Sequence, residues 1–130
     1  MLLMERRGIK KAINEIIVSD VPRFALDLVR DITKEVSIPE KVESWARENI
    51  SESEIEKIAD EIMKDPKLRE KWMDEYEMCM MLFRSHRYCV SVASSSVVRD
   101  YFSSEEGREK LLDWVKRYLK EKINTLAYMK

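Results

Sequence analysis

Three side chains able to ligate a soft metal ion lie close together in the sequence, namely Cys79, His86 and Cys89. A structural zinc site needs four ligands, and the spacing of these three matches no standard zinc module. Cys79 also belongs to the apolar face of its predicted helix, where a thiol packs as a small hydrophobic group. The sequence therefore predicts two free thiols and no metal site. A Cys79–Cys89 disulfide is the alternative, and it requires the two flanking helices to meet near His86.

A cluster of serines follows the second cysteine, at Ser91, Ser94, Ser95 and Ser96. A serine nucleophile needs a base and a third group that orients the base, and beyond the nearby His86 no motif supplies them. Small residues on a helix more often let a neighbouring helix approach closely, and we favour that interpretation. The chain also has no glycine-rich phosphate loop. We therefore predict no cofactor and favour a protein without enzymatic activity.

Cationic and hydroxyl side chains around the same segment form the strongest candidate binding site. The patch consists of Arg84, His86, Arg87, Ser91, Ser95 and Arg99. Arginine captures phosphates and carboxylates through two parallel hydrogen bonds. The patch therefore predicts binding of an external anion or, as the alternative, pairing with the acidic surface of Glu70, Asp74 and Glu77. That pairing can form within one molecule or between two subunits.

Carboxylates recur at helical spacing in two ladders, which are Glu70, Asp74 and Glu77 and then Glu52, Glu56 and Asp60. Carboxylates on one helical face can hold Mg²⁺, which makes a magnesium-dependent phosphohydrolase one candidate function. A ladder of this kind is more often a solvated acidic face, and we prefer that interpretation.

Basic residues gather near the start of the first predicted helix and along the last one. These cations are Arg6, Arg7, Lys10 and Lys11, and then Lys116, Arg117, Lys120 and Lys122. Two such strips could contact phosphate backbones. Few aromatic residues accompany them, and the net charge of the chain is only −1. Weak nucleic-acid binding is therefore an alternative function.

Apolar residues recur every three or four positions along most of the chain, which is the pattern of amphipathic helices. The predicted helices cover about residues 5–18, 20–36, 37–50, 51–64, 65–83, 88–102 and 104–127. Helix starts are indicated by Asp65 before Pro66 and by serine–glutamate capping boxes at Ser37/Glu40, Ser51/Glu54 and Ser103/Glu106. From Tyr88 to Val98, strand-like alternation competes with helical spacing. The helical pattern covers more residues and is preferred.

Together these elements predict one all-α domain over residues 1–130, a compact bundle of six to seven helices. The long C-terminal helix is expected to pack against the second and fifth helices. Trp45, Trp72 and Trp114 lie on or beside apolar faces, so we expect them to be partly buried.

Charged residues make up 38% of the chain, which has three asparagines and no glutamine, a composition typical of thermophile proteins. Residues 41–80 carry a net charge of −5 and residues 81–130 one of +4. Regions of opposite charge can attract each other within one molecule or between two. The short apolar run before Glu5 is too brief for a signal peptide or a membrane span, which predicts a cytoplasmic protein with no membrane partner. We therefore expect a small non-catalytic interaction protein that binds a protein partner or is a self-associating subunit of a larger assembly.

Overall fold

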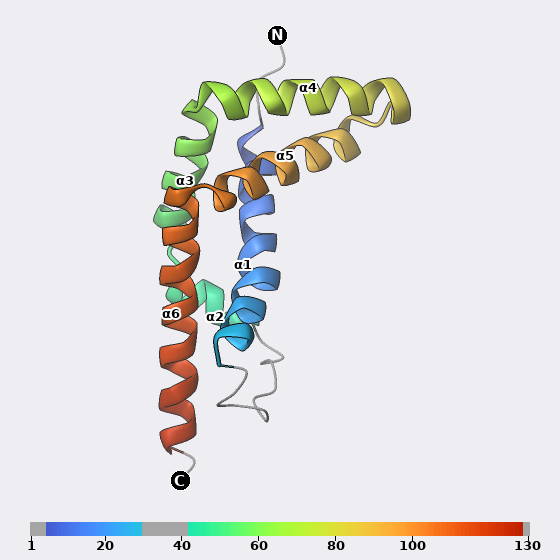
Figure 1. The fold of residues 1–130 in the computed structure, drawn as a ribbon. Coiled ribbons are helices and arrows are strands. Elements are labelled where there is room, and N and C mark those ends of the chain that lie inside the picture. The colour runs from blue at the N-terminus through green and yellow to red at the C-terminus, as the bar shows by residue number, and fades with distance from the viewer. Residues whose placement is uncertain (1–4, 30–41, 129–130) are drawn as a thin grey trace.

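The computed structural model describes residues 5–29 and 42–128, and every regular secondary-structure element in these ranges is an α-helix (Figure 1). The six helices are α1 (Arg6–Val29), α2 (Val42–Asn49), α3 (Glu52–Lys64), α4 (Pro66–Phe83), α5 (His86–Ser103) and α6 (Glu105–Tyr128). The predicted all-α bundle is confirmed. Residues 88–98 lie inside α5, so the helical interpretation of that segment was correct.

The first predicted helix and residues 20–29 of the second form one continuous helix, α1, so the predicted break near Asp20 is wrong. Residues 30–36 of the second predicted helix lie outside the described residues. Pro22 lies inside α1 and is itself buried. A proline in a helix interior removes one backbone hydrogen bond and usually bends or ends the helix. Here the buried face continues without a phase change from Ile17 through Val21 to Ala25, each at most 1% exposed. Burial of that face along α1 compensates for the lost bond.

Helix starts follow the sequence signals at two of the predicted positions. Ser51 and Glu54 form the predicted reciprocal capping box, with N···O distances of 3.2 and 3.0 Å. Asp65 caps α4 and Pro66 is its first residue. The predicted start at Ser103/Glu106 is one residue early, because α5 includes Ser103, whose hydroxyl donates to the carbonyl of Arg99.

Ser104 is the residue that caps α6, since its hydroxyl oxygen accepts from the N–H of Gly107 at 3.2 Å. The predicted box at Ser37/Glu40 lies outside the described residues. The side chains of Lys122, Ile123 and Leu126 do too, so their predicted roles stay untested.

Two long helices and a hairpin define the shape of the molecule (Figure 1). Helices α1 and α6 lie side by side, and α3 packs against α1. Helices α4 and α5 form an antiparallel pair that crosses one end of this body and projects beyond it. The contacts of α6 are mainly with α1 and α5. The expected packing of the last helix against the 66–83 helix is therefore wrong, because α5 occupies that position.

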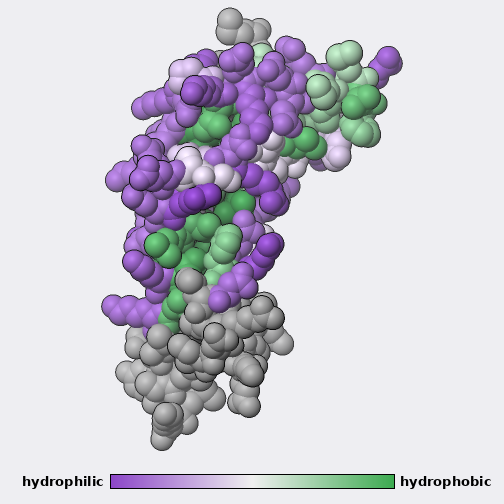
Figure 2. Space-filling model, in the orientation of Figure 1, coloured by the Kyte–Doolittle hydropathy of each residue, from purple (hydrophilic) through white to green (hydrophobic). Residues whose placement is uncertain are grey.

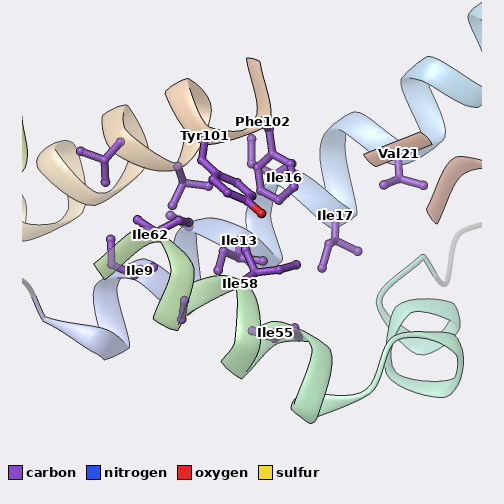
Figure 3. Close-up of a cluster of buried hydrophobic side chains, with 14 of the residues drawn as sticks. Ile9, Ile13, Ile16, Ile17, Val21, Ile55, Ile58, Ile62, Tyr101 and Phe102 are labelled. Carbon is purple, nitrogen blue, oxygen red and sulfur yellow. The ribbon is translucent and has the colours of Figure 1, made fainter. Parts of the chain in front are cut away.

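The core is built largely from isoleucines of α1 and α3, with aromatic rings of α5 above them (Figure 3). The labelled side chains are Ile9, Ile13, Ile16, Ile17, Val21, Ile55, Ile58, Ile62, Tyr101 and Phe102. The three tryptophans are buried more deeply than expected, with at most 6% of each side chain exposed. No helix in the described ranges has the length and hydrophobicity that a membrane crossing requires.

Small residues bring α1 and α5 into close contact, as the serine cluster predicted. A Cβ atom at Gly8 would lie 2.6 Å from the hydroxyl oxygen of Ser94 and 2.8 Å from Val90. Ser94 is fully buried, and its hydroxyl accepts a hydrogen bond from the indole N–H of Trp72 at 3.1 Å. Ser94 is therefore a packing residue.

Candidate functional site

The turn between α4 and α5 consists of only two residues, Arg84 and Ser85. Arg84 has a φ of 50°, and its N–H donates to the carbonyl of Met80. Glycine is the usual residue in this left-handed conformation, and another residue costs about 1 kcal/mol. The Ser85 hydroxyl accepts from the N–H of Tyr88 and starts α5. The turn folds the chain back sharply and presents a charged side chain at the end of the hairpin.

Large apolar side chains are exposed around this turn. The exposed fractions are 66% for Met78, 82% for Met81, 71% for Leu82, 60% for Phe83 and 51% for Tyr88. We call these five residues the apolar tip. Figure 2 shows a hydrophobic cluster at the projecting end of the molecule, separated from the main body by polar surface. An exposed apolar cluster of this kind marks an interaction site.

The sequence did not lead us to the apolar tip. Helical spacing places Phe83 on the apolar face that includes Cys79, which predicts its burial, and it singles out none of Met78, Met81 and Leu82. The available signal was the run of six apolar residues from Met78 to Phe83, next to the polar turn. A helix that is apolar all round must be covered on every side, and exposed apolar runs are otherwise rare.

Behind the apolar tip, Cys79 of α4 and Cys89 of α5 form a disulfide, with Cα atoms 5.5 Å apart. The prediction of two free thiols is therefore wrong. The condition for the alternative is met, because the tight turn brings the two helices together near His86. Both cysteines are buried, at 6% and 0% exposed. The bond fixes the two helices to each other at the base of the apolar tip.

His86 is connected to neighbouring polar groups. One ring nitrogen lies 2.7 Å from the hydroxyl of Tyr76 and the other 3.1 Å from the carboxylate of Glu5. These contacts join the hairpin to the start of α1. Among the described residues, no three histidine, cysteine, aspartate or glutamate side chains are grouped so that they could hold a metal ion.

The predicted anion-binding patch is divided between the hairpin end and a second place farther along α5. Arg84, His86 and Arg87 lie at the hairpin end, and Ser91 is exposed on the helix between them and the others. Ser95 and Arg99 instead line a recess of about 200 Å³ between α5 and α1. The same recess is lined by Glu15, whose carboxylate disfavours an anion there. The structure therefore does not bring the six residues together into one pocket.

The acidic ladder of α3, formed by Glu52, Glu56 and Asp60, is paired with the basic residues of α1. Arg6 contacts Glu56 at 2.7 Å and Asp60 at 2.5 Å, and Lys10 contacts Glu56 at 2.7 Å and also Glu52. These ion pairs join α1 to α3. They engage carboxylates suggested as magnesium ligands and cations suggested as phosphate contacts, so both suggested sites lose ligands there.

The second basic strip is also partly engaged. Arg117 contacts Glu54 at 2.9 Å and Asp113 at 2.7 Å, and it donates to the carbonyl of Asn49. Four cations of the two basic strips are exposed and form no ion pair with another described residue. These are Arg7, Lys11, Lys116 and Lys120.

The acidic ladder of α4 forms no ion pair in the part of the chain that the structure describes. Glu70, Asp74 and Glu77 are exposed on α4 and form no ion pair there. The predicted pairing with the cations of α5 within one molecule is therefore absent among these residues. Neighbouring side chains connect the two helices instead, with Lys71 bound to Asp100 and Ser96 to Glu75.

Ion pairs between helices predict a loss of stability in acid. Hydrogen bonds from Arg117 hold the pKa of Glu54 below its usual value of 4.5, and those from Lys10 and Arg6 do the same for Glu56. Because these groups bind protons more readily in the unfolded chain, the free energy of unfolding should be level above about pH 5 and fall as the pH drops below 4.5. Urea unfolding at steps of about one pH unit between pH 3 and 7 measures this change in the free energy of unfolding.

An Arg117→Met variant provides the control for the acid prediction. It should lose about 1 kcal/mol or less at neutral pH, since the pair with Glu54 is about one-third exposed. Its stability should also depend less on pH than that of the original protein. Equal pH dependence in the two proteins would contradict the role given to Glu54.

Comparisons with protein families, with curated proteins and with solved structures found no match to this chain.

Proposed function

We propose that this protein is a non-catalytic interaction protein that binds a protein partner through the apolar tip. The observation that carries the proposal is the exposure of five large apolar side chains at the projecting end of the α4–α5 hairpin (Figure 2). Monomeric proteins rarely expose large contiguous apolar patches, and those that occur often mark interaction sites. A protein partner would remove this surface from water.

The chemistry of the tip supports a protein partner. Methionine, aromatic residues and arginine are enriched in protein interfaces, and the tip combines Met78, Met81, Phe83 and Tyr88 with the adjacent Arg84. Methionine side chains adapt to the shape of an opposing surface. Phe83 and Tyr88 pack edge to face, with ring centroids 5.3 Å apart. This contact orders two of the exposed rings before any partner arrives.

The construction of the hairpin also supports binding. A two-residue turn and a disulfide limit the movement of the helices next to the tip. A surface that is already ordered loses less conformational entropy on association. We place the function in the cytoplasm. Structural disulfides are rare there, but intracellular proteins of hyperthermophiles are an exception, which agrees with the thermophile-like composition of this chain.

Site-specific photo-crosslinking tests the proposal. A photoreactive phenylalanine analogue replaces Leu82 in the tip, and a control variant carries it at the exposed Lys57 of α3. In cells of the source organism, the Leu82 variant should give a discrete protein adduct, identified by mass spectrometry, and the Lys57 variant should not. Equal or absent crosslinking at the two positions would contradict the proposal.

A pair of substitutions separates binding from folding. Changing Met81 and Leu82 together to glutamate should abolish binding. With the photoreactive analogue placed at the nearby Tyr88, the same change should also abolish the adduct. Because both side chains are more than 70% exposed, the free energy of unfolding should change by only about 0.5 kcal/mol. A large loss of stability would instead mean that the tip belongs to the core.

A further inference from the structure

We infer that the partner at the apolar tip is a second copy of this chain. The two copies would pair through the outer faces of their α4 helices, antiparallel across a two-fold axis beside Met78 and Met81. This inference rests on the proposed function and adds the identity of the partner and the geometry of the contact.

The outer face of α4 carries one continuous stripe of exposed residues at helical spacing. It begins with Glu70, Asp74 and Glu77 and continues with Met81, three and four positions apart. Met78 lies beside it, and Arg84 follows at the end of the helix. This face lies on the opposite side of α4 from Trp72 and Cys79, which contact Ser94 and Cys89 of α5. The stripe is thus acidic at the base of the hairpin, apolar near the tip and basic at the end.

A stripe with this order of charges is complementary to itself when it is reversed. In a two-fold contact the same patch serves both subunits, so each residue pair occurs twice. With the axis between Met78 and Met81, the methionines of both copies meet at the centre. At a rise of 1.5 Å per residue, Arg84 lies about 7 Å beyond the axis, and the partner's Glu77 about 4 Å beyond it on the same side. The arginine side chain can span that difference.

The free charges on the stripe favour this occupant over others. Within the described residues, neither Arg84 nor Glu77 forms an ion pair or side-chain hydrogen bond, so both are available to a partner. The acidic ladder directly beside the tip would repel a nucleic acid or an anionic lipid surface. Met78 and Met81, 66% and 82% exposed, supply the apolar surface at the centre of this contact. Arg84 also occupies a left-handed backbone conformation in which glycine would be less costly. This cost is expected if the arginine side chain binds a partner.

Analytical ultracentrifugation of the full chain, over micromolar to millimolar concentrations, tests the inference. The protein should sediment as a dimer of its 15.5 kDa chain at the upper concentrations. Met81→Glu should give a monomer. Arg84→Glu alone and Glu77→Arg alone should each weaken dimerisation by about tenfold or more, since each places like charges opposite each other twice. Lys57→Glu, on the exposed face of α3, should leave the dimer unchanged.

Mixing the two charge variants gives the most specific result. A dimer of one Arg84→Glu chain and one Glu77→Arg chain contains only opposite charges in both pairs. An equimolar mixture should therefore recover dimerisation that neither variant shows alone. Thermal melting and circular dichroism should show each variant folded as the original protein is.

Three results would overturn the inference: a chain that stays monomeric throughout, a dimer indifferent to Met81→Glu, or a mixture that does not recover association. A monomeric chain whose Leu82 position still crosslinks to a different protein would leave the proposed function standing and refute only the identity of the partner. A monomeric chain with no specific crosslink would refute both.

Discussion

Replacing Gly107 by alanine should lower the free energy of unfolding by about 3 kcal/mol, and the thermal midpoint by roughly 10 °C. A Cβ atom at this position would lie 2.0 Å from the carbonyl oxygen of Tyr101 and 2.6 Å from the Cα of Phe102. Both are backbone atoms, which cannot rotate away as a side chain can. The first turn of α6 would have to move off the end of α5. That movement would disturb the packing of Phe102 on Trp114, whose ring centroids are 5.6 Å apart.

Two further substitutions serve as controls, followed by urea unfolding and by thermal melting. Glu109→Ala, on the exposed side of the same helix, should change stability by about 0.5 kcal/mol or less. Gly8→Ala should cost less than the change at Gly107, because the close atoms there belong to the side chains of Ser94 and Val90. Alanine also favours a helix over glycine by about 1 kcal/mol. A Gly107→Ala protein as stable as the original would show that α6 does not meet α5 this closely.

Loss of the Cys79–Cys89 disulfide should lower the free energy of unfolding by about 3 kcal/mol. The bond closes a short loop, with a sequence separation of 10 residues, and so removes conformations from the unfolded chain. The effect should be concentrated in the hairpin. Amide hydrogen exchange at Met81 to Tyr88 should quicken, whereas exchange in α1 and α3 should follow only the change in global stability. The loss should also weaken association through the apolar tip, since the helices beside it become less ordered.

Reduction with dithiothreitol and a Cys79→Ala/Cys89→Ala variant measure this effect independently. Dithiothreitol should destabilise the original protein and leave the variant unchanged, which excludes a general effect of the reagent. Alkylation of the denatured, unreduced protein, followed by mass spectrometry, counts the free thiols directly. Two alkylated cysteines would contradict the disulfide and restore the prediction made from the sequence.

Features that depend on neighbouring residues were determined by the sequence alone. Helical spacing of apolar residues predicted the all-α class and resolved the segment from Tyr88 onwards. The start of α3 at Ser51 and the start of α4 after Asp65 were also predicted correctly. Caps of this kind are made by side chains two or three residues from the backbone groups that they bind, so the local sequence contains the whole interaction. Burial of the tryptophans followed from their place on apolar faces.

Features that join distant segments were decided only by the tertiary structure. The continuation of α1 through Pro22 depends on the burial of Val21 and Ala25 in the core, which local propensity does not include. The pairing of Arg6 with Glu56, fifty positions apart, required the packing of α1 on α3. The apolar tip is likewise a tertiary result. A run of apolar residues becomes a surface only when the helix that carries it projects beyond every element that could cover it.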